Sequence, residues 1–329
     1  MSTASHDDAP RDHDKDVVIV GAGISGLYCA WRLIEDDPTR RITIVERLNR
    51  TGGRLDTDLI QVSADDEVRE EEGGMRFNTA MTELMQLVAA LGLCDEIVPF
   101  AMTSASDAQP NTNRFNLRGR SFSAADAAAG KNAIWGEIYR LEEREKGLSP
   151  SDLITQAYTA VLAQNHSTPG DSTPPEFWTE LRNTFTWQGT RLRDWQLWGL
   201  LRSMGYSQEC IQMLADTVGF AGPFKAPINA GDAFQLLADF PKDPNYLTFR
   251  NGFSTLPNAV RDRLPAQVEI LLGTNVDCIE RTGDRFVLRL TKAPDQQSSH
   301  PHIAGGKVQT RSAKKVILAV ATTALEQLF

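Results

Sequence analysis

The amino-acid sequence predicts an α/β fold in which one sheet-containing domain is interrupted by a helical insertion. Near the start of the chain, residues 16–20 and 41–45 are short apolar, β-branched runs of the kind found in buried parallel strands. Residues 124–215 have a mostly helical pattern. After about residue 245, extended runs return at 267–272, 276–280, 285–290 and 315–320. The order α/β, helical, β is what a discontinuous sheet domain with an insertion produces.

The first two extended runs flank an amphipathic helix. Leu27, Ala30, Trp31 and Ile34 recur at helical spacing, and the pattern ends before Pro38. Strand, helix and strand in this order predict a βαβ unit.

Later helices are predicted from apolar spacing and from their end signals. Thr82 to Leu91 is amphipathic, and Pro150-Ser151-Asp152 is a helix start for residues 153–164. Another helix carries Trp195, Trp198, Leu201 and Met204 and ends at Gly205. Polar segments predict loops at residues 101–113, 165–175 and 294–306.

Composition predicts a soluble, cytoplasmic protein of two or three domains. The chain has 329 residues, is 41% hydrophobic and carries a net charge of −9 without a basic run, which argues against nucleic acid as a partner. The most apolar stretch, residues 17–31, is too short for a membrane span. The polar, acidic start predicts a disordered tail, not a signal peptide. Cys29, Cys94, Cys210 and Cys278 lie far apart and predict reduced, mostly buried thiols.

A glycine fingerprint follows the first predicted strand. Gly21, Gly23 and Gly26, with Ile24 and Ser25 between them, match G-x-G-x-x-G at the start of the predicted helix. A pyrophosphate would lie at the helix N-terminus, where free N–H groups and the helix dipole favour negative charge. The pattern therefore predicts a Rossmann-type dinucleotide site.

Glu46 stands at the end of the second predicted strand, 20 residues after Gly26. A carboxylate there accepts hydrogen bonds from ribose hydroxyls and repels a 2′-phosphate, which disfavours NADP. The alternative to a dinucleotide site is a structural glycine turn beside an unrelated surface Glu. The complete pattern, in which a strand, a helix, a second strand and a terminal acid follow one another, argues against that alternative.

A second glycine segment distinguishes FAD from NAD. Residues 47–57 read RLNRTGGRLDT, so that Arg47, Gly53 and Arg54 follow the ribose-binding acid directly. An NAD site has no need of this segment, whereas the longer pyrophosphate and ribityl chain of FAD suits a second loop. We therefore expect FAD as the cofactor.

These segments resemble the flavin amine oxidase superfamily. The resemblance rests on the glycine pair before Arg54 and on three further segments in the family's order, residues 71–77 (EEGGMRF), 251–257 (NGFSTLP) and 315–320 (KVILAV). Asn275-Val276 is similar to the segment whose valine backbone contacts the adenine. The resemblance implies a Rossmann-type (GR2-like) FAD-binding domain with a helical insertion and a mixed-sheet substrate-binding domain. The cofactor residues that it implies are Gly21, Gly23, Ile24, Ser25, Gly26, Glu46, Arg47, Gly53, Arg54, Gly73, Gly74, Met75, Arg76 and Val276.

The resemblance also divides the chain into segments. We expect a disordered tail at 1–15, an FAD-binding domain at 16–75 and 250–329, a substrate-binding domain at 76–123 and 216–249, and a helical domain at 124–215.

Arg76 carries the expectation about the substrate. The family's simple monoamine oxidases tend to have an aromatic residue at this position, and its L-amino acid oxidases have arginine. A guanidinium binds a carboxylate through two parallel hydrogen bonds. We therefore expect an L-amino acid substrate that is oxidised with O₂ to the 2-oxo acid, ammonia and H₂O₂. An ion pair of Arg76 with Glu71, Glu72 or the FAD phosphates is the structural alternative.

Two other functions remain open at the level of sequence. One is oxidation of an amine that has no carboxylate, and the other is a truncated, non-catalytic flavin-binding protein. The resembling enzymes continue past the last predicted strand with a flavin-proximal lysine and a final glycine-rich FAD segment. Here the chain stops at Phe329, and Ala321 replaces the usual proline. We therefore expect a fragment or incomplete gene product, in which no catalytic residue can be named. A homodimer is also compatible with the sequence.

The remaining polar and aromatic motifs give weaker indications. His300-Pro301-His302 favours a solvated loop over a metal site, and the acidic runs 65–67 and 70–72 predict solvated turns and edges. Residues 201–206 (LRSMGY) are similar to a segment of bacterial tryptophan oxidases, although a helix end capped by Gly205 explains most of that pattern. The tryptophans at 187–198 predict either core packing or a substrate pocket.

Overall fold

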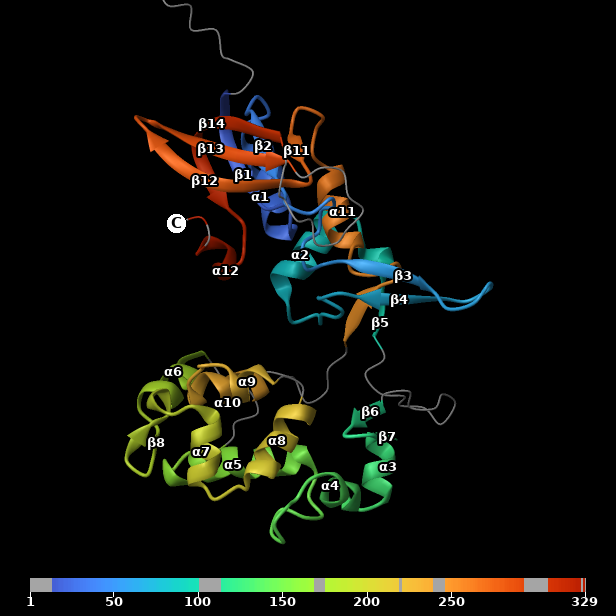
Figure 1. Ribbon diagram of the computed structural model, residues 1–329, viewed down its shortest axis with the longest axis vertical. Helices are drawn as coiled ribbons and strands as arrows, with labels where there is room; N and C mark the ends of the chain where they lie inside the picture. Colours follow the sequence, from blue (N-terminus) through green and yellow to red (C-terminus); the bar gives the residue numbers. More distant parts are fainter. Residues whose placement is uncertain are drawn as a thin grey trace, which may run out of the picture. The chain divides into compact units, whose positions relative to one another are not determined.

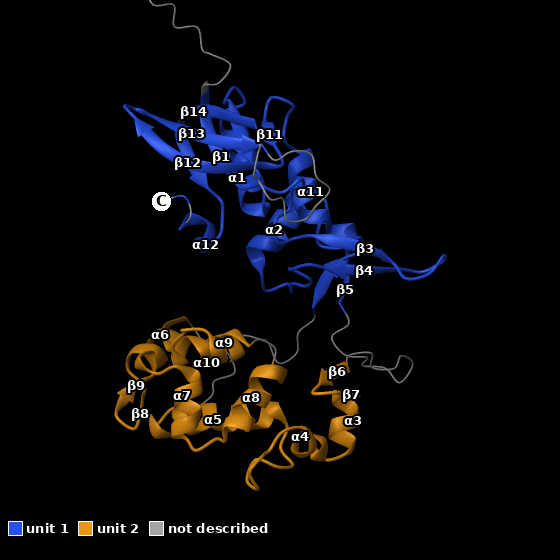
Figure 2. Cartoon of the chain, in the orientation of Figure 1, with its two compact units in different colours: residues 1–100, 245–329 blue, residues 101–244 orange. Residues whose placement is uncertain are grey.

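The computed structural model of the chain describes residues 14–100, 114–168, 175–218, 221–238, 246–292, 307–326 and 328. It divides into two units (Figure 2): unit 1 comprises residues 1–100 and 245–329, and unit 2 comprises residues 101–244. The predicted loops at 101–113 and 294–306, most of the predicted tail and the two histidines at 300 and 302 lie outside the described residues.

Unit 1 is built on a six-stranded mixed sheet with the order β11-β2-β1-β14-β13-β12 (Figure 1). β1 (Asp14–Val20) pairs in parallel with β2 (Ile42–Val45) and with β14 (Lys307–Leu318), and β11 (Glu269–Leu271) pairs in parallel with β2. β12 (Thr274–Thr282) and β13 (Arg285–Lys292) continue the sheet in antiparallel pairing. Because both faces of β1 are covered, Val17 and Ile19 lie in one core cluster and Val18 and Val20 lie in another.

Helix α1 (Ile24–Asp36) follows β1 and buries the predicted apolar face, with Leu27 and Ala30 fully buried. It shares a core cluster with residues of α2 (Thr82–Leu91) and α11 (Thr255–Asp262). The short helix α12 (Thr322–Leu325) follows β14. The predicted βαβ unit and the α2 boundaries are thus confirmed.

Two small antiparallel sheets complete unit 1. The hairpin β3 (Thr57–Gln61) and β4 (Glu67–Glu71) follows the second glycine segment, and β5 (Ile97–Pro99) after the short helix η1 (Cys94–Glu96) pairs with β10 (Leu247–Phe249). The prediction that residues 70–72 are only a solvated edge was wrong for Glu71. Its carboxylate accepts hydrogen bonds from Thr57 Oγ1 at 2.9 Å and from the Phe253 N–H at 3.2 Å, which fastens the hairpin to residues before α11.

Unit 2 is predominantly helical and has its own core cluster. Its helix α5 (Pro150–Gln164) starts with a capping box, in which the Ser149 side chain accepts a hydrogen bond from the Asp152 N–H and the Asp152 carboxylate accepts one from the Ser149 N–H. After α7 (Leu197–Ser203), the Tyr206 N–H donates to the Leu201 carbonyl and the Gly205 N–H donates to the Arg202 carbonyl, which is the predicted glycine C-cap. The elements are β6 (Arg114–Leu117), β7 (Arg120–Ser123), α3 (Ala124–Ala129), α4 (Ala133–Ile138), α5 (Pro150–Gln164), α6 (Pro175–Asn183), β8 (Thr186–Trp187), β9 (Thr190–Arg191), η2 (Leu192–Asp194), α7 (Leu197–Ser203), α8 (Gln208–Thr217), α9 (Gly222–Lys225) and α10 (Ala230–Ala238).

Several expectations need correction. β1 begins at Asp14, so the last two residues of the predicted tail belong to the sheet, and β14 begins eight residues before the predicted run at 315–320. The cysteines are free, but only Cys210 is buried, and Cys94 is exposed because it lies on the surface helix η1. The finer division into FAD-binding, substrate-binding and helical segments stays a prediction.

The partly buried carboxylate of Asp16 makes the stability of unit 1 depend on pH. Burial raises the pKa of Asp16, but hydrogen bonds from the Arg41 N–H and from Lys314 outweigh it and lower the pKa to about 2. Since the folded pKa lies below the unfolded value, Asp16 stabilises the fold above about pH 4 and loses this effect as the pH falls toward 2.

We expect Asp16→Asn to lower the free energy of unfolding by roughly 1–2 kcal/mol at pH 7 and by less at pH 3. Urea unfolding at both pH values measures the difference. The exposed Asp284→Asn is the matched control, and it should change stability little at either pH. A penalty for Asp16→Asn that is equal at pH 7 and pH 3 would contradict the ionic role.

Candidate functional site

A cavity of about 1380 Å³ opens in unit 1 at the carboxyl ends of the parallel strands. Val20 and Gly21 end β1, Val45 and Glu46 end β2, and Leu318 and Ala319 end β14. This is the edge at which open α/β sheets bind ligands. The described residues that line it are Val20, Gly21, Gly23, Ile24, Ser25, Val45, Glu46, Arg47, Leu48, Gly52, Gly53, Arg54, Leu55, Gly73, Gly74, Thr274, Asn275, Val276, Asp277, Leu318, Ala319, Val320, Ala321, Thr323, Ala324 and Leu328.

The first glycine segment forms the turn between β1 and α1. The Gly21 N–H donates to the Val45 carbonyl at 2.8 Å, and α1 starts after Gly23, which supplies no side-chain cap. The N-terminal N–H groups of α1 therefore face the cavity edge. A Cβ at Gly26 would lie 1.9 Å from the Gly21 carbonyl oxygen, so only glycine permits this approach of helix to strand.

Glu46 is held by two backbone amides. Its Oε2 accepts from the Ala22 N–H and its Oε1 from the Leu48 N–H, both at 2.8 Å. The Thr274 N–H donates to the Glu46 carbonyl at 2.8 Å, which joins the end of β2 to the start of β12. The carboxylate is thus fixed at the cavity wall while each oxygen keeps capacity to accept another hydrogen bond.

The second glycine segment packs directly on the first. The Gly52 N–H donates to the Ala22 carbonyl at 2.9 Å, and Gly23 and Gly52 form a parallel bridge. Arg50, which the sequence did not single out, donates from Nη1 to the Gly53 carbonyl at 2.9 Å and pairs with Asp56 at 2.7 Å. These contacts fix the loop that presents Arg54 to the cavity.

The third glycine segment packs on the second. The Gly74 N–H donates to the Arg54 carbonyl at 3.2 Å. A Cβ at Gly73 would lie 1.9 Å from the same carbonyl oxygen, so this position also requires glycine. Segments that are 20 to 50 residues apart in the sequence therefore form one wall of the cavity.

Arg76 lies two residues beyond this wall and is half-buried. Its guanidinium carbon is 4.6 Å from the ring centroid of Tyr246 and 5.8 Å from that of Phe100. The next residue, Phe77, exchanges backbone hydrogen bonds with Leu247 at 2.9 and 2.7 Å. The Arg76 guanidinium therefore makes cation–π contacts with two aromatic rings of unit 1.

The structure brings most predicted cofactor residues to one cavity. Gly21, Gly23, Ile24, Ser25, Glu46, Arg47, Gly53, Arg54, Gly73, Gly74 and Val276 line it. Gly26, Met75 and Arg76 are not among its lining residues; Gly26 packs helix on strand, and Met75 is 43% exposed.

Two parts of the lining extend beyond the predicted cofactor residues, although Asn275 and residues 318–320 belong to segments that carry the resemblance. Thr274, Asn275 and Asp277 flank Val276, and residues 318–321 with Thr323, Ala324 and Leu328 follow β14. The position of the second group could have been predicted from the sequence, because the residues that follow a parallel strand next to β1 lie at the same edge of the sheet.

The cavity fits FAD on the chemistry of its wall. The α1 N-terminus offers N–H groups to a pyrophosphate, the oriented Glu46 offers acceptors to a ribose, and the backbone near Val276 offers polar groups to a purine. Within the described ranges, no group of three or more His, Cys, Asp or Glu side chains is placed to hold a metal ion. No helix in that part of the chain is long and apolar enough to cross a membrane.

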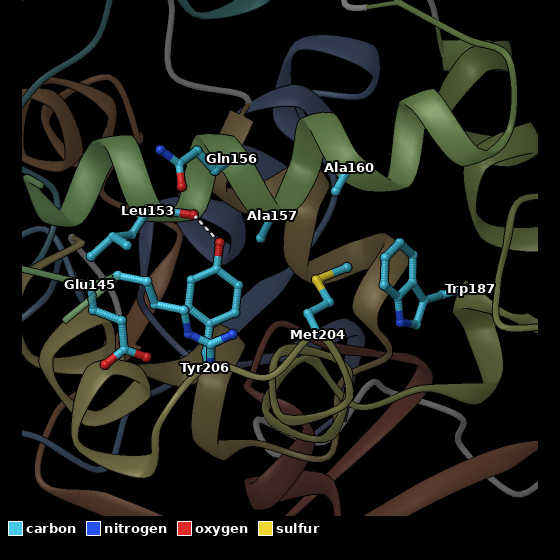
Figure 3. Close-up of a pocket in the computed structure, with 9 residues that line it drawn as sticks. Glu145, Leu153, Gln156, Ala157, Ala160, Trp187, Met204 and Tyr206 are labelled. Atoms are coloured by element: carbon cyan, nitrogen blue, oxygen red, sulfur yellow. Dashed lines mark hydrogen bonds between the residues drawn. The ribbon is translucent and has the colours of Figure 1, made fainter. Parts of the chain in front are cut away.

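A second, smaller cavity of about 270 Å³ lies within unit 2 (Figure 3). Leu153, Ala157 and Ala160 point toward it from α5, opposite Tyr206, Met204 and Trp187. The Tyr206 hydroxyl donates to the Leu153 carbonyl at 3.1 Å. Two residues of the 201–206 segment and Trp187 therefore line a pocket. Trp187, Trp195 and Trp198 all pack against the core of unit 2.

Comparison with known proteins places most of the chain in one family. The family model described as flavin-containing amine oxidoreductase matches residues 24–329. An uncharacterized protein of Acanthamoeba polyphaga mimivirus is 27% identical over 62% of the chain and 39% of its own length. Aplysianin-A of Aplysia kurodai is 32% identical over 39% of the chain and 22% of its own length.

Two further matches are more limited. Coproporphyrinogen III oxidase of Staphylococcus aureus is 37% identical over 26% of the chain and 17% of its own length. A solved structure from Exiguobacterium sp. 255-15 has 20% identity and a TM-score of 0.45, covering 95% of this chain and 61% of its own. The chain thus spans 17–39% of the length of these three curated relatives.

The glycine contact between α1 and β1 predicts the effect of a single methyl group. We expect Gly26→Ala to push α1 away from the turn, to cost roughly 1–3 kcal/mol of stability and to weaken FAD binding at least about tenfold. Thermal unfolding and flavin fluorescence titration measure the two effects. Gly222→Ala is the matched control because a Cβ there meets nothing within 4 Å. FAD binding by Gly26→Ala with wild-type affinity would contradict the role of this contact.

The two amide contacts of Glu46 predict the effect of an isosteric change. In Glu46→Gln only one side-chain oxygen remains, so either the Ala22 or the Leu48 N–H loses its acceptor. We expect the affinity for FAD to fall by about tenfold, which corresponds to about 1.4 kcal/mol. Calorimetric titration of the apoprotein checks this, with the exposed Glu280→Gln as control. An unchanged Kd for FAD would show that the carboxylate is not needed.

Proposed function

Because the chain belongs to the flavin-containing amine oxidoreductase family, we propose that it takes part in the FAD-dependent oxidation of an L-amino acid, with Arg76 as the group that binds the α-carboxylate. One observation carries the substrate assignment. The Arg76 guanidinium lies over the rings of Tyr246 and Phe100, in unit 1, two residues after Gly74 at the wall of the cavity.

The chemistry of Arg76 suits a carboxylate. A guanidinium that stacks through its face still presents N–H groups along its edge, and two parallel N–H donors match the two oxygens of a carboxylate. The aromatic rings also exclude water from one side of the cation, which strengthens a charge-assisted hydrogen bond.

The cofactor residues hold the reacting partners in position. FAD, when bound, supplies a hydride acceptor for the substrate Cα–H, and O₂ then takes up the electrons to give H₂O₂. The α1 N-terminus would hold the pyrophosphate, and Glu46 would hold the ribose of the adenosine. The imino acid product hydrolyses in water to the 2-oxo acid and ammonia, so no side-chain base is required for a neutral amine substrate.

The proposal predicts that Arg76 separates amino acids from amines. We expect Arg76→Ala to weaken L-amino acid binding roughly 30- to 1000-fold, because a bidentate charged pair is worth about 2–4 kcal/mol. Binding of the corresponding decarboxylated amine should change less than about threefold. Arg76→Lys should lie between, since it keeps the charge and loses the second donor. Perturbation of the bound flavin's absorbance by each compound measures the affinities, and H₂O₂ release measures turnover.

Arg281→Ala provides the control, because Arg281 is exposed on β12 and donates to the Gly283 carbonyl. It should bind both compounds as the wild-type chain does. Equal losses of amino acid and amine affinity in Arg76→Ala would assign Arg76 a structural role and favour an amine substrate.

A further inference from the structure

Strand β12 contains a bulge where it passes the cavity. Val276 pairs with Leu290 and Cys278 pairs with Arg289, so the register shifts between them and Asp277 is the extra residue. In a bulge the extra residue stands outside the regular ladder of backbone hydrogen bonds. Residues 274–277 all line the cavity.

The bulge changes which residues of β12 face the core. Thr274 and Val276 are buried before the bulge, and Ile279 packs on the same core cluster as Val276 after it. Inward positions thus change from even to odd numbers. A regular strand would have kept residue 278 inward, so the bulge is part of the packed structure of the sheet.

The Asp277 side chain closes the bulge. Its Oδ1 accepts a hydrogen bond from Asn275 Nδ2 at 2.9 Å, and its Oδ2 accepts one from Thr291 Oγ1 at 2.6 Å. Asn275 and Thr291 are themselves cross-strand partners. One carboxylate therefore joins both members of the pair beside the bulge, while Arg289 lies 4.0 Å from the same carboxylate.

The start of β12 is tied to the ribose-binding position. The Thr274 N–H donates to the Glu46 carbonyl, so the bulge begins three residues from a backbone contact with Glu46. A base attached to a ribose held by Glu46 would then meet the β12 backbone. Adenine presents an amine donor and ring-nitrogen acceptors along its edge, which the backbone C=O and N–H groups left out of the ladder can match.

We propose that Asp277 is a positioning residue that, through Asn275 and Thr291, holds the bulged backbone of residues 275–277 against the adenine of FAD. The inference rests on FAD as the cofactor, and it does not depend on which substrate is oxidised. Asp277 acts on the backbone and not on the flavin ring, so its effect lies in the recognition of the base.

The test compares FAD with flavin hypoxanthine dinucleotide, in which a carbonyl replaces the adenine amine. For each protein, the ratio of the two Kd values reports recognition of the base, because a general loosening of the fold weakens both ligands alike. The variants are Asp277→Ala, Thr291→Val and the conservative Thr291→Ser, with Thr310→Val on the exposed part of β14 as control. Fluorescence titration of the apoproteins gives both Kd values without any turnover.

We expect the wild-type chain to prefer FAD by about tenfold or more. Asp277→Ala should weaken FAD binding and bring the ratio close to one, and Thr291→Val should lower the ratio in part. Thr291→Ser and Thr310→Val should keep the wild-type ratio. A wild-type ratio of one, or an unchanged ratio in Asp277→Ala, would overturn the proposal. Loss of L-amino acid binding in Arg76→Ala has no bearing on this ratio, so the two proposals fail separately.

Discussion

The close contact between Gly26 and Gly21 is the constraint on which the rest of unit 1 depends. It sets α1 against β1 so that the helix N-terminus lies at the sheet edge. The Ala22 carbonyl then accepts a hydrogen bond from the Gly52 N–H, and the Ala22 N–H donates one to the Glu46 carboxylate. Through Gly74 and Arg54 the same arrangement extends to the third glycine segment. A side chain at the first contact would therefore disturb every later one, because each segment takes its position from the one before it.

The parts of the fold that sequence could predict are those governed by local chemistry. Helix α2 has the predicted bounds because its apolar spacing and the Gly92 after it are local signals, and α5 begins at Pro150 because Ser149 and Asp152 cap it. Glu46 was predictable because the lengths of α1 and β2 fix its distance from the glycine turn. These features need no knowledge of what packs against them.

The features that escaped prediction depend on pairing between distant residues. The β12 bulge is set by its register with β13 and by the Thr291 hydroxyl, and the early start of β14 at Lys307 follows from its pairing with β13. Arg50 has no motif of its own, and its role appears only when Asp56 and the Gly53 carbonyl are placed beside it. Glu71 likewise looks like one acid in an acidic run until Phe253, far along the chain, donates to it. Local patterns cannot encode such partners.

The same backbone contacts that shape the cofactor cavity also fix the position of Arg76. On one side, Gly74 is bonded to the Arg54 carbonyl, and on the other, Phe77 is bonded in both directions to Leu247. Only Met75 and Arg76 lie between these anchors. The backbone of only these two residues therefore separates the guanidinium from the cavity wall. Tyr246 contacts the guanidinium because the bridge between Phe77 and Leu247 places the neighbouring Tyr246 beside it. Residues from two distant parts of the sequence thus fix the position of Arg76 relative to the cavity wall.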